Sequence, residues 1–279
     1  MAEAEEDFKG KWKDMIINDF DIKQIAESGE CFRWNKIKDN HYSGIIGDNY
    51  CEVLQDGKNV EFLGISEEDV KYYFDLDRDY SKIKEFYRAD DVLNKAIGFG
   101  DGIRILNQDK FETLISFIIS ANNNIPRIRK SVEKISNRYG KEIADGKFAF
   151  PTPKELQVAT EEELKETGVG FRAKYIVNTC QAINNGFDLE KVAKLPTKEC
   201  KKELMKLMGV GPKVADCVML FSMGKIDAFP VDVWIKRIME KLYIKEEMSL
   251  SQIQKYSEEK FGEYAGIAQQ YLFFYARSL

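Results

Sequence analysis

Histidine is almost absent from this chain, since His41 is the only one among 279 residues. Chemistry that needs a histidine base or several histidine ligands is therefore nearly excluded, and His41 falls in a predicted strand where we expect a structural role. The five cysteines are odd in number, and no Cys-x-x-Cys pair occurs among Cys31, Cys51, Cys180, Cys200 and Cys217. Their spacing predicts reduced thiols rather than a disulfide framework, and we expect no metal site.

Long apolar runs are missing as well. No stretch approaches the roughly 20 residues of a membrane-spanning helix, and residues 1–7 are acidic, unlike a secretory signal. We therefore expect no membrane association and a cytoplasmic protein, associated with the nucleoid if the source is a prokaryote. The hydrophobic share of 44% and the charged share of 32% are those of an ordinary soluble protein.

The net charge of −5 is unevenly distributed along the chain. Residues 1–90 hold 22 acidic and 13 basic side chains, whereas residues 191–245 hold 12 basic and 6 acidic ones. A locally basic segment can contact phosphates even in an acidic protein. On its own, this pattern favours the simpler interpretation of lysine-rich helices that are solvated.

Four short runs rich in aromatic and β-branched residues predict an antiparallel sheet in the first third of the chain: 31–37, 41–46, 50–55 and 58–63. Asp56-Gly57 is a strong hairpin signal between the last two. From Ser66 onward the apolar spacing is helical. The expected helices include 111–120, 155–167, 174–184, 193–207, 212–223, 232–242, 249–261 and 264–276. We expect an α+β fold, with a sheet domain over 1–98 and helical domains over 99–187 and 188–279.

The most informative segment is 207–217, with the sequence LMGVGPKVADC. Gly209 and Gly211 bracket a turn between two predicted helices, where glycine permits positive φ and close backbone approach. Pro212 suits the first turn of a helix, which places Gly211 at a helix N-terminus able to bind a phosphate oxygen. This order resembles the helix–hairpin–helix DNA-binding motif, and it favours phosphate binding for the surrounding basic segment.

Two residues near this hairpin can carry chemistry. Lys213 lies in the first turn of the second helix, where the helix N-terminus disfavours a cation, and a neutral amine there can form a Schiff base with a sugar carbon. A lysine that only contacts a phosphate is the simpler alternative. Asp232 precedes another predicted helix as its N-cap, which would hold a carboxylate rigidly. Cys217 shares a helix face with Lys213, and the two can form either an amine–thiol or an ammonium–thiolate pair.

Separated segments together resemble the 8-oxoguanine DNA glycosylase/lyase family, a branch of the helix–hairpin–helix glycosylases. They are SGECFRW at 28–34, NNNIPR at 122–127, GVGFRAKY at 168–175, the hairpin through Asp232, and YAGIAQ at 264–269 followed by Phe273. The iron–sulfur cluster common in the superfamily needs a C-terminal cysteine quartet. No cysteine follows Cys217, so we expect a branch without the cluster and no cofactor.

The resemblance implies a role for each matched residue around the lesion. Lys213 resembles the nucleophile that displaces the damaged base and then supports β-elimination, and Asp232 the carboxylate that stabilises positive charge on the sugar. The residues implied to hold the extruded base are Gly29, Cys217, Gln269 and Phe273. Cys217 and Phe273 would sandwich the base, and Gln269 would read its pairing edge. The Gly29 carbonyl would accept N7–H, which 8-oxoguanine has and guanine lacks.

On the opposite strand, Asn122, Arg127 and Arg172 match the side chains that hold the unpaired cytosine. Without this match, a helix cap would explain Asn122 equally well. Phe171 stands where animal relatives carry a tyrosine wedge, which keeps the stacking but loses the hydroxyl. Trp234 stands where those relatives carry a phosphate-contacting histidine.

The resemblance implies a monomeric enzyme that acts on double-stranded DNA, excises 8-oxoguanine paired with cytosine through a lysine Schiff base, and cleaves the strand. The alternatives are a glycosylase for another purine lesion and a non-catalytic helix–hairpin–helix DNA-binding protein.

Overall fold

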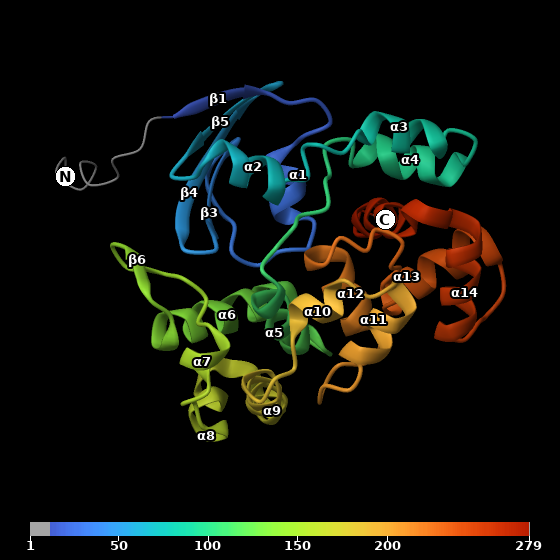
Figure 1. The fold of residues 1–279 in the computed structure, drawn as a ribbon. Helices are drawn as coiled ribbons and strands as arrows, with labels where there is room; N and C mark the ends of the chain where they lie inside the picture. The colour runs from blue at the N-terminus through green and yellow to red at the C-terminus, as the bar shows by residue number, and fades with distance from the viewer. Residues whose placement is uncertain (1–11, 279) are drawn as a thin grey trace.

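The computed structural model describes residues 12–278. It begins with a five-stranded antiparallel sheet in the order β1-β5-β4-β3-β2, against which helices α1 (Ile22–Glu27) and α2 (Glu67–Tyr73) pack (Figure 1). The strands are β1 (Lys13–Ile16), β2 (Asn35–Lys38), β3 (His41–Ile46), β4 (Asn49–Asp56) and β5 (Asn59–Leu63). The last three agree with the predicted strands to within one residue. Asp56 pairs with Asn59 across the predicted hairpin, and Gly57 has a φ of 58°.

Two details of the sheet differ from the sequence prediction. The first predicted strand is too long, because Cys31, Phe32 and Trp34 lie in a buried loop before β2. Their burial does not alternate as it would along a strand with one solvated face. Strand β1 was not predicted, because it is a mostly exposed edge strand and its sequence KDMI carries no alternating apolar signal.

The rest of the described chain is mainly helical, which confirms the predicted α+β class. The helices are α3 (Tyr80–Phe86), α4 (Asp91–Phe99), α5 (Lys110–Ser120), α6 (Ile125–Tyr139), α7 (Pro153–Leu156), α8 (Glu161–Leu164), α9 (Ala173–Asn184), α10 (Leu189–Ala193), α11 (Thr197–Leu204), α12 (Pro212–Ser222), α13 (Val233–Ile238), α14 (Leu250–Phe261) and α15 (Ala265–Ala276). Strands β6 (Glu142–Ala144) and β7 (Lys147–Phe148) form a small hairpin after α6. Helices α3 and α4 lie beside the C-terminal helices, with α4 packed on α15 (Figure 1). The domain boundaries at 98 and 187 stay predictions.

Two predicted helices are interrupted. The one expected over 155–167 consists of α7, α8 and a wider turn (Lys165–Val169), because Thr160 starts a new helix with a capping box to Glu163. The one expected over 193–207 begins only at Thr197. Pro196 lacks an N–H and restricts the residue before it, so α10 ends before the proline and α11 starts after it.

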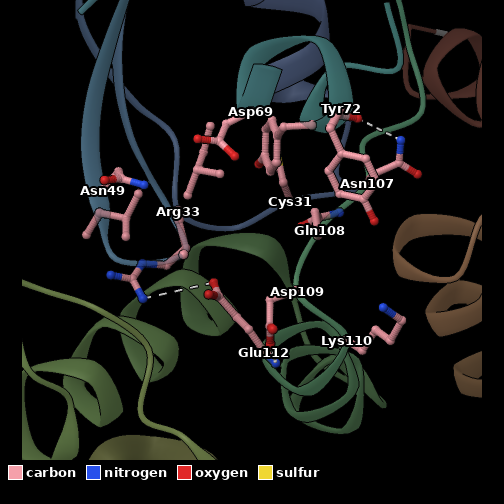
Figure 2. A pocket seen from close by; sticks show the side chains of 14 residues that line it. Cys31, Arg33, Asn49, Asp69, Tyr72, Asn107, Gln108, Asp109, Lys110 and Glu112 are labelled. Atoms are coloured by element: carbon pink, nitrogen blue, oxygen red, sulfur yellow. Dashed lines mark hydrogen bonds and ion pairs between the residues drawn. The ribbon is translucent and has the colours of Figure 1, made fainter. Parts of the chain in front are cut away.

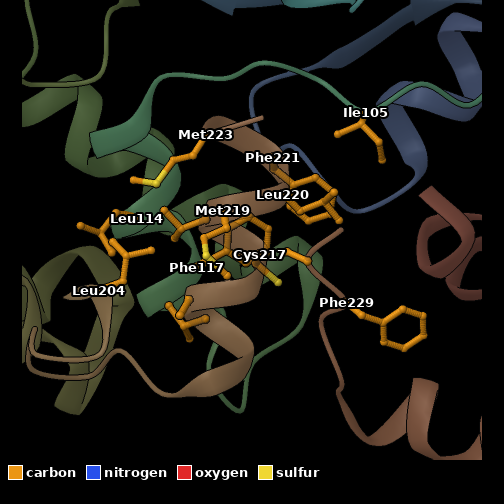
Figure 3. Packing of buried hydrophobic residues seen from close by; sticks show 14 of the residues in the cluster. Ile105, Leu114, Phe117, Leu204, Cys217, Met219, Leu220, Phe221, Met223 and Phe229 are labelled. Carbon is orange, nitrogen blue, oxygen red and sulfur yellow. The ribbon is translucent and has the colours of Figure 1, made fainter. Parts of the chain in front are cut away.

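Helix α12 runs through the centre of the helical core. Every residue from Val214 to Ser222 is buried, and Phe221 stacks on Phe117 of α5 with ring centres 5.5 Å apart. Figure 3 shows this packing around Cys217. Burying a large apolar side chain contributes about 1.5–3 kcal/mol, so the helix is held firmly along its length. Lys213, near its N-terminal end, therefore projects from a rigid support.

Arginine side chains join the sheet domain to the helices. Arg129 of α6 donates from Nη1 to the Trp34 carbonyl at 2.7 Å and from Nη2 to the Ala26 carbonyl at 2.9 Å. Arg33 donates to Ser136 Oγ at 2.7 Å. These contacts bracket residues 28–32, so the loop that carries Gly29 is fixed against the helical part.

Candidate active site

A cavity of about 360 Å³ brings together residues that lie far apart in the sequence. Four predicted site residues line it: Gly29, Lys213, Asp232 and Phe273. Its other lining residues are Phe32, Phe117, Ser120, Asn123, Asn124, Ile125, Pro126, Ile128, Trp234 and Arg277. A single amine, a carboxylate, an aromatic face and a glycine backbone therefore line one cavity that is open to solvent.

Lys213 is the second residue of α12 and is held by two residues of α5. Its Nζ lies 3.4 Å from Ser120 Oγ and 4.9 Å from the centre of the Phe117 ring. The face of an aromatic ring attracts a lysine side chain electrostatically, so Phe117 helps to hold Nζ in place. Sequence reasoning missed both partners, because Phe117 belongs to an apolar run that predicts only a buried helix.

Asp232 caps helix α13, as predicted. Its Oδ1 accepts the N–H groups of Trp234 at 3.0 Å and Ile235 at 2.8 Å. Both capping bonds use the same oxygen, so Oδ2 takes no part in the cap. The cap fixes the carboxylate while leaving one oxygen for chemistry in the cavity.

Cys217 and Gln269 are buried and do not line the cavity. Burial raises the pKa of the Cys217 thiol to about 11, although the nearby Lys213 amine acts in the opposite direction. This favours a thiol over a thiolate in the DNA-free protein. Gln269 Oε1 is buried without a hydrogen-bond partner among residues 12–278, and an orphaned acceptor of this kind is available to a ligand. Gln269 precedes Phe273 by one helical turn of α15, which places both on one face.

Position 29 requires a glycine both for its backbone conformation and because a side chain would have little room. Its φ is 93°, and an added Cβ would stand 3.3 Å from both Ile125 Cδ1 and Phe273 Cε1. Its neighbour Glu30 is fully buried, which raises the pKa of that carboxyl well above its ordinary value. The Glu30 carbonyl accepts from Gln108 Nε2 at 2.8 Å. The loop thus presents its backbone beside the aromatic face of Phe273.

The two glycines of the hairpin, Gly209 and Gly211, differ from each other in conformation and in surroundings. Gly209 has a φ of 83°, and a Cβ there would stand 2.6 Å from the ring of Tyr175, so close packing and positive φ both demand glycine. Gly211 has a φ of −88° and is the N-cap of α12. An added Cβ on Gly211 would meet nothing within 4 Å. The positive φ that the motif permits therefore occurs at Gly209 alone, and Gly211 leaves open space at the helix N-terminus.

The predicted opposite-base residues flank the cavity edge formed by Asn123 and Asn124. Asn122 is exposed with a φ of 52°, and Arg127 is exposed on the first turn of α6. Asn124, rather than Asn122, caps that helix by accepting the Arg127 N–H at 3.0 Å. Asn122 is therefore not the N-cap of α6. It follows the C-cap of α5 with a φ of 52°, the left-handed conformation that commonly ends a helix.

Arg172 is buried against the same turn. Its guanidinium donates from Nε to the Ala121 carbonyl at 2.9 Å, from Nη2 to the Asn122 carbonyl at 3.0 Å, and from Nη1 to the Val169 carbonyl at 3.1 Å. Nη2 also donates to the Ala121 carbonyl. These bonds occupy four of its five N–H groups. Phe171, whose ring lies 4.5 Å from the guanidinium carbon, is 58% exposed, as a wedge residue must be.

A second cavity of about 300 Å³ lies between the sheet and the start of α5. Figure 2 shows Arg33 and Glu112 facing each other there, with Nη1 and Oε1 3.9 Å apart. Burial raises the pKa of Glu112 to about 7, while the Arg33 guanidinium lowers it. None of the predicted site residues lines this cavity, so the cavity with Lys213 is the candidate active site.

Within residues 12–278, no group of three or more His, Cys, Asp and Glu side chains is arranged to hold a metal ion. In the same range, no helix is both long and apolar enough to cross a membrane.

Comparison with known proteins identifies the family of the chain. Residues 14–114 match the N-terminal domain of 8-oxoguanine DNA glycosylase, and residues 115–263 match the HhH-GPD superfamily of base excision DNA repair proteins. A probable N-glycosylase/DNA lyase of Methanothermobacter thermautotrophicus is 33% identical, over 94% of this chain and 95% of that protein. The N-glycosylase/DNA lyase of Saccharomyces cerevisiae is 32% identical, over 90% of this chain and 82% of that protein.

Solved structures extend the likeness to three dimensions. The 8-oxoguanine glycosylase/lyase of Clostridium acetobutylicum, in complex with double-stranded DNA containing cytosine opposite 8-oxoguanine, superimposes with a TM-score of 0.91 at 45% identity. The match covers 96% of this chain and 98% of that one. The chain therefore belongs to the 8-oxoguanine DNA glycosylase family, within the HhH-GPD superfamily of base excision DNA repair proteins.

Proposed function

We propose that this chain excises 8-oxoguanine paired with cytosine from duplex DNA and then cleaves the strand at the abasic site. The observation that carries the proposal is the cavity that Lys213, Asp232, Gly29 and Phe273 line together. The names of the relatives, N-glycosylase/DNA lyase and 8-oxoguanine glycosylase/lyase, support both steps.

In the first step, Lys213 acts as a neutral amine. The Nζ lone pair attacks C1′ of the sugar, the C1′–N9 bond breaks, and the base leaves with the bonding electrons and takes up a proton. The Asp232 carboxylate stabilises positive charge on the sugar as the bond breaks. Its Oδ2, free of the helix cap, is also the acceptor for the proton that Nζ must lose.

In the second step, the sugar ring opens and Nζ is left in a Schiff base with C1′. The iminium makes the C2′ protons acidic, so that loss of one of them expels the 3′ phosphate and breaks the C3′–O bond. The Asp232 carboxylate, which lines the same cavity, can take up the C2′ proton, and water then hydrolyses the Schiff base and frees Lys213.

Recognition of the base depends on the Gly29 backbone. The N7–H of 8-oxoguanine donates to the Gly29 carbonyl, whereas guanine would bring an acceptor against an acceptor, at a cost of about 1–3 kcal/mol. The base must first leave the duplex, which costs a few kcal/mol. Phe273 lies against Gly29 and offers a stacking face, and the orphaned Gln269 Oε1 can accept from the pairing edge of the base.

For the opposite strand, we assign the cytosine contact chiefly to Arg127 and Asn122. Cytosine offers the N3 and O2 acceptors, and Arg127 is an exposed donor. Arg172 uses most of its N–H groups to hold the turn at Ala121 and Asn122. Its main contribution is therefore to present Asn122. Phe171, the exposed ring beside it, fills the space that the extruded base leaves.

Trapping with borohydride tests the proposal. Incubation of the protein with an 8-oxoguanine:cytosine duplex and sodium borohydride should give a covalent protein–DNA complex, and Lys213→Gln should give none while still binding the duplex. A folded Lys213→Gln variant that still traps would overturn the assignment. A panel of lesions in identical duplexes separates the other candidates: preferred release of another purine indicates a different glycosylase, and binding without any release indicates a DNA-binding module.

A further inference from the structure

Arg277 lies at the wall of the active-site cavity, beside the loop that carries Gly29. Its Nη1 donates to the Glu27 carbonyl at 2.8 Å and to the Ser28 carbonyl at 3.3 Å. The same atom lies 3.7 Å from the position that a Gly29 Cβ would take. Carbonyls at a helix C-terminus lack partners within the helix and attract a cation, so the end of α1 holds this guanidinium.

The loop is pinned on both sides of Gly29. Arg277 holds the carbonyls of the two preceding residues, and Gln108 holds the carbonyl of Glu30 at 2.8 Å. A glycine at positive φ is conformationally permissive, so its carbonyl direction depends on such external bonds. The two clamps therefore set where the Gly29 carbonyl points.

The position of Arg277 on α15 connects this clamp to the base pocket. Gln269, Phe273 and Arg277 follow one another at intervals of one helical turn, on one face of the helix and its C-cap. The guanidinium carbon lies 6.0 Å from the centre of the Phe273 ring. Helix α15 thus aligns three groups: the Gln269 amide, the Phe273 ring and the Arg277 guanidinium, which holds the loop of Gly29.

We infer that Arg277 is a positioning residue for base recognition: it aligns the Gly29 carbonyl with the N7–H of the extruded base. The inference rests on the proposed function, because the Gly29 contact is part of it. Arg277 therefore affects only the step in which an extruded base contacts the Gly29 carbonyl. Cleavage of a preformed abasic site requires Lys213 but no base, so it does not depend on Arg277.

The test uses variants of the full chain and compares their activity on two DNA substrates. Arg277→Ala should slow single-turnover excision of 8-oxoguanine by about 10- to 100-fold, because small misplacement of a recognition group has effects of that size. Cleavage of a duplex with a preformed abasic site should stay close to that of the unsubstituted protein. Arg277→Lys, which keeps a cation at the end of α1, should recover part of the excision rate.

Arg237→Ala is the matched control, because Arg237 is also an arginine but lies on α13, over the ring of Trp234, which lines the cavity. It should lower both rates equally or neither. Equal losses on the two substrates for Arg277→Ala, or no loss on either, would overturn the inference. If the unsubstituted protein releases no 8-oxoguanine, the proposed function fails, whatever the variants do. Thermal unfolding of each variant separates these outcomes from loss of the fold.

Discussion

The amine of Lys213 lies 4.9 Å from the centre of the Phe117 ring. The ring in turn stacks on Phe221, from the same helix as the lysine. The proposed nucleophile is thus positioned by the hydrophobic core, because Phe117 packs on Phe221 inside the protein and also lines the cavity. The position of the Lys213 amine and the packing of the core therefore depend on the same side chain, Phe117.

This relationship predicts different outcomes for two similar substitutions. Phe117→Leu and Phe221→Leu should each destabilise the fold by about 1–3 kcal/mol, since each leaves a partly unfilled space in the core. Only Phe117→Leu removes the surface that holds Nζ, so it alone should slow borohydride trapping, by about tenfold. Single-turnover kinetics and chemical denaturation measure the two effects. Equal trapping rates for both variants would show that the ring serves the core alone.

Gly29→Ala should abolish most excision without unfolding the protein. The positive φ costs roughly 1–2 kcal/mol for alanine, and the new Cβ would press on Phe273 and Ile125 at 3.3 Å. Gly47→Ala is the control, because Gly47 has a φ of 58° and open space around it in the β3–β4 turn. Gly47→Ala should lose stability through the positive φ alone, and Gly29→Ala should lose somewhat more in thermal unfolding because its Cβ is also crowded. If Gly47→Ala also lost excision, backbone strain rather than base reading would explain the result.

Glu112 predicts a pH-dependent stability. Burial raises its pKa from an ordinary 4.5 to about 7, so its carboxyl binds a proton more readily in the folded state than in the unfolded one. Its contribution to stability is therefore full below about pH 4.5 and is lost as the pH rises through about 7. Glu112→Gln stays neutral, so its melting temperature relative to the unsubstituted protein should rise between pH 5 and pH 8.

The control for this experiment is Glu68→Gln, in the exposed first turn of α2. Its melting temperature should track that of the unsubstituted protein across the same range. A difference for Glu112→Gln that stays constant between pH 5 and pH 8 would show that the ion pair with Arg33, rather than desolvation, dominates.

The sequence was most informative where one residue type has one physical explanation. Asp232 before a helix predicts a cap, and Gly209 in a tight hairpin predicts positive φ; the structure confirms both. The residues that support the site were not predictable in this way. Phe117 looks like any core residue, and Arg277 contacts carbonyls 249 and 250 positions away. Only the packed fold brings such partners together.

The same limit explains the errors in the helices. Apolar spacing predicted one helix over 155–167, but the capping box at Thr160 supplies stronger local bonds and divides it. Arg172 shows the limit for function. Its matched position suggested a cytosine contact, and its four bonds to main-chain carbonyls became visible only in the structure.

Arg127 and Arg172 should therefore respond differently to substitution. Arg127→Ala removes an exposed donor, so excision opposite cytosine should fall by about 10- to 100-fold, since a hydrogen bond from a charged group contributes about 1.5–3 kcal/mol. Excision opposite adenine should change little, because that base lacks the O2 acceptor. Arg172→Ala releases the turn at Ala121 and Asn122, so it should lower both rates and the melting temperature.

Lys130→Ala is the control for lost positive charge, because Lys130 is also exposed on α6. It should weaken binding to all duplexes alike. If Arg127→Ala behaved like Lys130→Ala, Arg127 would be a phosphate contact, and the preference for cytosine would have to come from Asn122.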